Sequence, residues 1–324
     1  MSHPFAKLTP DFVIDCVEAL GIPADLRLSA LNSYENRVYQ VGVEDQDPLI
    51  VKFYRPDRWS QAQILEEHAF ALELFAAEIS IVAPQCIAGQ SLHEVNGFLI
   101  AVFQRRGGYP PELDNLDHLL VLGRTLGRIH AVGAAQPFSH RDPLPVLSRF
   151  EENCEYLAAH WLPDELRAAW SSLAKDLSIA IAERTDDLQA KDAIRLHGDC
   201  HVGNILWRDD VPHFIDLDDC AGGPAIQDLW MFLSGDRPQQ ELQLAELIAG
   251  YEEFMDFDAR QLHWIETLRT ARMVHHAAWI ARRWHDPAFP KAFTFFTAPR
   301  YWSDQILALR EQLALLQEPP LRLL

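Results

Sequence analysis

The stretch Leu196-His197-Gly198-Asp199-Cys200-His201-Val202-Gly203-Asn204-Ile205-Leu206-Trp207 decides how this chain is interpreted. Its skeleton is H-x-D-x-x-x-x-N, and a further aspartate, Asp216, follows the apolar pair Phe214-Ile215 twelve residues after Asn204. A carboxylate can orient a hydroxyl and take its proton. Amide and carboxylate oxygens are hard ligands that suit Mg²⁺. The stretch therefore predicts a site that combines proton transfer with a bound metal ion.

This spacing is the one found in the catalytic loop of protein kinases. On that pattern Asp199 and Asp216 are the catalytic residues, with Asp199 beside the attacking hydroxyl. Asn204 and Asp216 bind Mg²⁺ across the phosphates of a nucleoside triphosphate. We interpret His197 as a residue that supports the loop through hydrogen bonds, and Asp228 as a helix cap or a brace of the same loop.

A strand-like run upstream contains the lysine that this pattern requires. Leu49–Tyr54 carries Lys52, which we expect to hold the phosphates. The helix predicted over Gln61–Glu78 offers Glu66 and Glu67 as its ion-pair partner. Glu67 is preferred because apolar residues follow it four and seven positions later on a packing face, and Glu66 stays open as the alternative.

The rest of the chain divides into a strand-rich first third and a helical remainder. The predicted strands are Arg37–Val43, Leu49–Tyr54 and Phe98–Phe103, and the first two helices are Asp11–Leu20 and Gln61–Glu78. Further helices are predicted over Asp117–Val132, Glu152–His160, Pro163–Arg184, Gln239–Phe254, Ala259–Trp284 and Tyr301–Leu316, with a β-rich island at Ile194–Asp219. Arg105–Pro111 breaks the composition. We therefore expect an α+β fold with lobes at residues 1–105 and 106–324.

Composition excludes several classes of function. The 324 residues include 28 Lys+Arg and 47 Asp+Glu, a net charge of −19, which repels nucleic acids and anionic membranes. The start of the chain has no apolar leader segment, and five cysteines without a C-x-x-C pattern favour free thiols. We expect a cytoplasmic monomer that binds neither nucleic acid nor membrane.

The acidic stretch also fits two other interpretations. A two-metal hydrolase could use the mixed cluster His197, Asp199, His201, Asp216 and Asp218. That alternative leaves Lys52 and Asn204 without a role. Cys200 and Cys220 flank the site, but without a neighbouring cation we expect inert thiols rather than a redox switch.

The motifs resemble the aminoglycoside phosphotransferase and choline kinase branch of the protein-kinase-like fold. The matching residues are His197-Gly198-Asp199 through Asn204, Ile215-Asp216, Gly223 and Asp228-Leu229, and long stretches elsewhere resemble its serine/threonine protein kinases of the bacterial stress response. The resemblance implies a two-lobed fold, Mg²⁺-ATP as donor and protein serine or threonine hydroxyls as acceptors. It also implies that Ser33, Lys52 and Glu67 serve nucleotide binding and that Phe103–Arg106 faces the adenine.

Two departures from ordinary protein kinases stand out. The loop Leu31–Val38 has no glycine, so the usual Gly-rich phosphate cradle is missing. Only eight residues separate Asp219 from Asp228, too few for a long phosphorylated activation loop. The motifs do not reach the acceptor, so a small-molecule kinase remains an alternative that suits an acidic chain and a cationic acceptor. A nucleotide-binding regulatory module is a further alternative, which the intact acidic residues argue against.

Overall fold

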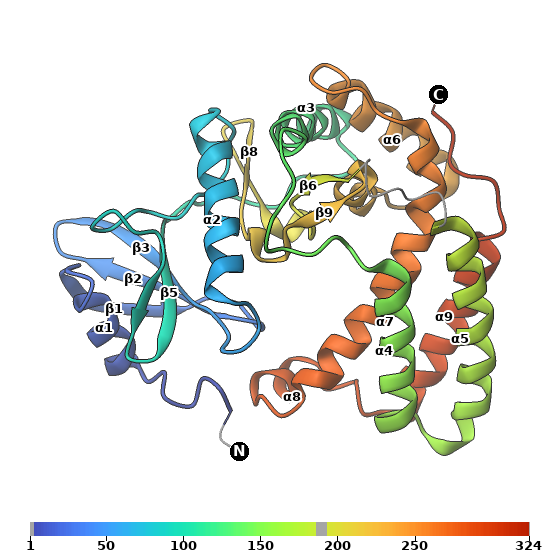
Figure 1. Cartoon of the computed structure of the whole chain (residues 1–324), viewed down its shortest axis with the longest axis horizontal. Helices are drawn as coiled ribbons and strands as arrows, with labels where there is room; N and C mark the ends of the chain where they lie inside the picture. Colours follow the sequence, from blue (N-terminus) through green and yellow to red (C-terminus); the bar gives the residue numbers. More distant parts are fainter. Residues whose placement is uncertain (1–2, 186–192, 324) are drawn as a thin grey trace.

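The N-terminal part of the chain forms one antiparallel sheet (Figure 1). The computed structural model describes residues 3–185 and 193–323. The strands follow the order β1-β2-β3-β5-β4. Their bounds are Ala24–Ala30 (β1), Arg37–Val43 (β2), Gln46–Phe53 (β3), His93–Val95 (β4) and Phe98–Gln104 (β5). β3 lies between β2 and β5 and pairs Lys52 with Val38 and Ala101, so this lysine is fixed at the centre of the sheet.

Two helices accompany the sheet. Helix α1 (Pro10–Glu18) begins after Thr9, whose side chain caps it, and packs its apolar face on the buried side of β2 and β3. Helix α2 (Gln61–Ala76) begins with a capping box between Ser60 and Gln63. It stands between the sheet and the helical part of the molecule (Figure 1), with Glu67 on its buried face.

The remainder of the chain is mainly helical. Its helices are α3 (Leu116–Gly133), α4 (Val146–His160), α5 (Asp164–Thr185), α6 (Arg237–Tyr251), α7 (Ile265–Arg283), α8 (Ala288–Ala292) and α9 (Pro299–Leu315). Two short antiparallel pairs lie among them: β6 (Ile194–Leu196) with β9 (Ala221–Gly223), and β7 (Ile205–Arg208) with β8 (Val211–Phe214).

Two apolar cores support this helical part. One lies beneath the two short strand pairs and between α3 and α6, which cross so closely that a Cβ at Gly123 would lie 2.0 Å from the Leu247 carbonyl oxygen. The other core is formed by α4, α5, α7 and α9 around Phe150 and Trp302. The first core supports the segments around β7 and β8, and the second core supports α7.

The predicted α+β architecture, a small antiparallel sheet followed by a larger helical part, is confirmed. Two helices differ from expectation: α4 begins at Val146, and the segment predicted as one helix splits into a 3₁₀ stretch, Ala259–Trp264, and α7. β1 was not predicted, because it is a mostly exposed edge strand interrupted by Leu26 at φ 67°. The lobe boundary at residue 105 stays a prediction. Among the described residues, no helix has the length and apolar character needed to cross a bilayer.

Candidate active site

One buried aspartate, Asp228, holds the stretch that carries the main motif. Its carboxylate accepts hydrogen bonds from the backbone N–H groups of His197 (2.7 Å) and Gly198 (2.9 Å), and it contacts His130 Nε2 at 3.1 Å. Gly198 has a φ of +85°, and a Cβ there would lie 2.0 Å from the Asp219 carbonyl oxygen, so only glycine fits. The bracing role predicted for Asp228 is confirmed.

Two hydrogen bonds join this stretch to the segment that carries Asp216. His197 Nε2 donates to the Ile215 carbonyl oxygen at 2.9 Å, which confirms its supporting role. The Ile215 N–H in turn donates to the Asn204 carbonyl oxygen at 3.0 Å. The metal-binding positions predicted from the sequence are therefore neighbours in space.

Asp199 presents an ionised carboxylate. Its Oδ1 accepts a hydrogen bond from Arg272 Nη1 at 2.6 Å, and its Oδ2 lies 3.5 Å from His201 Nε2. Burial acts to raise the pKa of this carboxyl group, but the hydrogen bond from His201 and the charge of Arg272 hold the pKa of Asp199 well below its ordinary value. The unprotonated form is the one that can accept a proton from a hydroxyl group.

Asn204 and Asp216 are the oxygen donors that could hold a cation. Asn204 Nδ2 donates to the Asp199 carbonyl oxygen at 3.0 Å, which leaves its side-chain oxygen for another partner. Asp216 has a φ of 60°, a conformation costly outside glycine and common at functional sites, and its side chain is 48% exposed. An amide oxygen and an accessible carboxylate on two hydrogen-bonded backbone segments suit Mg²⁺, which takes its other ligands from water and phosphate.

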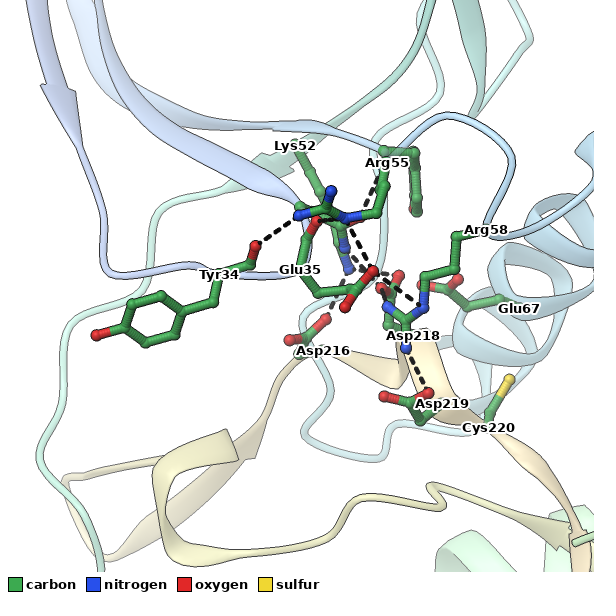
Figure 2. A network of polar contacts seen from close by, with 12 residues as sticks. Tyr34, Glu35, Lys52, Arg55, Arg58, Glu67, Asp216, Asp218, Asp219 and Cys220 are labelled. Atoms are coloured by element: carbon green, nitrogen blue, oxygen red, sulfur yellow. Dashed lines mark hydrogen bonds and ion pairs between the residues drawn. The ribbon is translucent and has the colours of Figure 1, made fainter. Parts of the chain in front are cut away.

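Lys52 reaches across from β3 to this acidic segment, as Figure 2 shows. Its Nζ lies 2.6 Å from Asp216 Oδ1 and 2.8 Å from Asp218 Oδ1, with only 7% of the side chain exposed. Burial opposes the charge, yet attraction to Asp216 and Asp218 holds the pKa of Lys52 well above its ordinary value. The fold thus brings Lys52 to Asp216, 164 residues away in sequence.

The prediction that Lys52 pairs with Glu67 is wrong, because Lys52 pairs with Asp216 and Asp218 among the described residues. Glu67 instead accepts from Arg141 Nη2 at 3.0 Å, while burial and repulsion from Asp218 raise the pKa of Glu67 to about 8. Glu66 does not pair with Lys52 either. It turns the other way and accepts backbone N–H bonds from the segment 139–141. Glu67 therefore faces the site without contacting the lysine.

Asp218 is a central residue that the sequence suggested only for the hydrolase alternative. It is 3% exposed and accepts hydrogen bonds of 2.6 Å from both Asn36 Nδ2 and Arg58 Nη1. Burial raises the pKa of a carboxyl group, but Lys52 and Arg58 hold the pKa of Asp218 well below its ordinary value. The pattern D-x-D after an apolar strand was its one signal, whereas nothing in the sequence marked Asn36 or Arg58.

The glycine-free loop Leu31–Val38 is fastened to the helical part of the molecule. The Glu35 carboxylate accepts hydrogen bonds from Trp279 Nε1 at 2.6 Å and from Arg283 Nη2 at 2.9 Å. Arg37 donates two bonds of 2.8 Å to Asp286, which is fully buried. Side-chain hydrogen bonds and ion pairs thus fix this loop against the helical part of the molecule.

Ser33 lies in the middle of this loop. Its Oγ accepts the Val38 N–H at 3.0 Å, so the hydroxyl closes the loop upon itself. Its predicted contact with a nucleotide stays a prediction.

The other interpretations find little support in the geometry. Within residues 3–185 and 193–323, no three His, Cys, Asp or Glu side chains form a group that could hold a metal, as a two-metal hydrolase would need. Cys200 and Cys220 are both buried, and burial raises the pKa of each thiol well above its ordinary value. Burial and a raised pKa are typical of inert structural thiols, which supports that prediction.

Known proteins are similar in sequence to nearly the whole of this chain. The model of the phosphotransferase enzyme family matches residues 27–265. Stress response kinase A of Escherichia coli K12 is 47% identical over 322 residues, which cover 98% of this chain and 97% of that protein. The serine/threonine protein kinase RdoA of Salmonella typhimurium LT2 is 46% identical over the same shares.

Solved structures agree on the fold. The amicoumacin kinase hAmiN, in complex with AMP-PNP, Ca²⁺ and Ami, superposes with a TM-score of 0.75 at 18% identity, covering 96% of this chain and 94% of that one. The microcompartment-associated aminopropanol kinase gives a TM-score of 0.68 at 19% identity, covering 96% and 100%. At these identities the likeness shows the shared architecture alone.

Proposed function

Because this chain belongs to the phosphotransferase enzyme family, we propose that it is an ATP- and Mg²⁺-dependent kinase that phosphorylates serine or threonine hydroxyls of proteins. The observation that carries the proposal is the convergence of Asp199, Asn204 and Asp216 with Lys52 from the sheet. The full-length relatives named stress response kinase A and serine/threonine protein kinase support a protein acceptor and a role in bacterial stress.

In this proposal each residue acts through charge and position. Asp199 orients the acceptor hydroxyl and takes its proton. Lys52 neutralises phosphate charge, Ser33 contributes a hydroxyl to the nucleotide loop, and Asn204 with Asp216 holds Mg²⁺. When bound, the metal ion supplies positive charge across the phosphate oxygens.

A kinase for a small hydroxyl compound is the second candidate. The solved structures that share the fold include kinases of amicoumacin and aminopropanol, which are small molecules. A nucleotide-binding module without turnover is less well supported, because Asp199 serves proton transfer and has no evident task in binding alone.

We further propose a monomer in the cytoplasm, a reducing compartment that suits its five free cysteines.

Transfer of labelled γ-phosphate from Mg²⁺-ATP separates the candidates. The acceptors are the protein itself, dephosphorylated casein, histone, and a panel of amino alcohols and aminoglycosides. Label on serine or threonine supports the protein kinase. Label confined to a small molecule would assign the chain to the metabolite kinases, and no transfer to any acceptor would contradict both.

A further inference from the structure

A pocket of ≈ 380 Å³ opens in the helical part of the molecule. Its walls include the aromatic side chains Trp230, Phe295 and Tyr301. Arg272 links the pocket to the site, because it lines the wall and bonds to Asp199. The volume lies at the small end of the ~300–1,000 Å³ range of ligand pockets, which suits one compact group.

The charged side chains that line this pocket have the opposite sign to the net charge of the chain. Its described lining contains Arg269 and Arg272 but no aspartate or glutamate, although the chain carries −19 overall. Exposed charges are screened within about 8 Å at physiological salt, so the nearest groups decide what binds. The net charge alone favours a cationic acceptor, whereas the lining of the pocket favours an anion.

Each arginine is paired with one carboxylate, but the two differ in how many N–H donors remain. Arg269 donates to both carboxylate oxygens of Glu266, at 2.9 and 3.1 Å, so its charge is already paired. The Arg272 side chain makes its one hydrogen bond within the described chain to Asp199, and it is 39% exposed. A guanidinium group has five N–H donors, so Arg272 keeps donors for a ligand while it holds Asp199.

We propose that this pocket binds an acceptor whose hydroxyl group is flanked by a carboxylate, and that Arg272 binds this carboxylate. The inference rests on the proposed phosphoryl transfer at Asp199. Arg272 Nη1 lies only 2.6 Å from the Asp199 carboxylate. An acceptor hydroxyl bound to Asp199 and an acceptor carboxylate bound to Arg272 are therefore separated by little more than the width of one guanidinium group. The anion therefore belongs to a residue next to the reacting serine or threonine, or to a free hydroxy acid.

The test is calorimetric binding to the full chain in the presence of Mg²⁺ and AMP-PNP. One pair of probes is a short peptide with a central serine between two glutamates and the same peptide with two glutamines. The second pair is glycerate and glycerol. A charge-assisted hydrogen bond stabilises a complex more than a neutral one does. We therefore expect the charged member of one pair to bind at least about tenfold more tightly than its neutral counterpart.

Variants assign this preference to Arg272. Arg272→Gln should remove the preference and Arg272→Lys should keep part of it. Arg300→Gln makes the same change at a side chain that is 90% exposed, and it should leave the preference intact. Equal affinity within both pairs, no binding of any probe, or a preference that survives Arg272→Gln would overturn the inference.

The two pairs also separate this inference from the proposed function. Preference for the glutamate peptide, with label transfer to its serine, supports both. Preference for glycerate alone, with label on glycerate, keeps the anionic acceptor and contradicts the protein kinase. Label on protein serines without any charge preference keeps the protein kinase and contradicts the role of Arg272.

Discussion

Two loops border the proposed site, and they are held in different ways. The catalytic stretch 197–204 is fastened by Asp228, only about 30 residues away in the same part of the molecule. The loop 31–38 is fastened by Arg283 and Asp286, which lie 248 and 249 residues from Glu35 and Arg37. The first loop therefore keeps its shape within the helical part, whereas the second ties the sheet to the helices. Breaking the first should impair chemistry, and breaking the second should impair nucleotide binding.

The largest effect is expected at Asp216, where the two parts of the molecule meet through Lys52. Asp216→Ala removes a proposed metal ligand. Mutation of a residue that only hydrogen-bonds to a metal ligand typically lowers metal affinity by about 10- to 100-fold. Loss of the ligand itself should therefore weaken Mg²⁺-dependent AMP-PNP binding by more than about 100-fold. Calorimetry with and without Mg²⁺ measures this, and an unchanged affinity would refute the metal role.

Asp228→Asn breaks the support of the catalytic stretch. The amide can accept only one of the two backbone N–H bonds, and a buried donor without a partner costs about 1–3 kcal/mol. We expect the free energy of unfolding in urea to fall by that amount and turnover at saturating ATP to fall at least about tenfold. A variant that keeps full turnover but binds nucleotide weakly would reverse the assignment of the two loops.

Asp286→Asn breaks the anchor of the loop 31–38. Arg37 and Arg55 both lose a buried anionic partner, so the loop should shift relative to the sheet. We expect AMP-PNP affinity to fall by less than about tenfold, equivalent to less than about 1.4 kcal/mol, with turnover at saturating ATP nearly unchanged.

Asp304→Asn is the matched control for this prediction. Its carboxylate is 67% exposed and pairs with Arg300 one helical turn away, an arrangement typically worth about 0–1 kcal/mol. A control that weakens nucleotide binding as much as Asp286→Asn does would show that the anchor has no special role.

Ser33→Ala should have the smallest effect. It removes the acceptor of the Val38 N–H, a bond worth about 1 kcal/mol, from a partly exposed loop. AMP-PNP affinity measured by calorimetry should therefore change by no more than about fivefold. A loss as large as that of Asp216→Ala would show that Ser33 itself is essential for nucleotide binding.

The same contrast explains what could be predicted from the sequence. The motif from His197 to Asn204 is contiguous, and its geometry follows from local turns and from Asp228 nearby. The sequence did not indicate that Asp218 pairs with Lys52, because the partners of Asp218 all come from distant parts of the chain. Asn36 and Arg58, for example, are 182 and 160 residues away. No periodicity reports contacts of that range.

The choice between Glu66 and Glu67 shows a second limit. Helical spacing correctly placed Glu67 on the buried face, since adjacent helical residues point about 100° apart. It could not show that Arg141, from a connecting segment, would take the Glu67 carboxylate. Helical periodicity indicates which face is buried, but the partner depends on how distant segments pack.

The central claim is that Asp199 accepts the proton of an attacking hydroxyl, and single-turnover transfer of labelled γ-phosphate tests it most directly. Wild-type protein and Asp199→Asn are compared at saturating Mg²⁺-ATP, with AMP-PNP affinity measured in parallel. General-base catalysis is worth about 10²–10⁴-fold, so the variant should transfer phosphate at least about 100-fold more slowly while binding AMP-PNP normally. Transfer at the wild-type rate by Asp199→Asn would contradict the account.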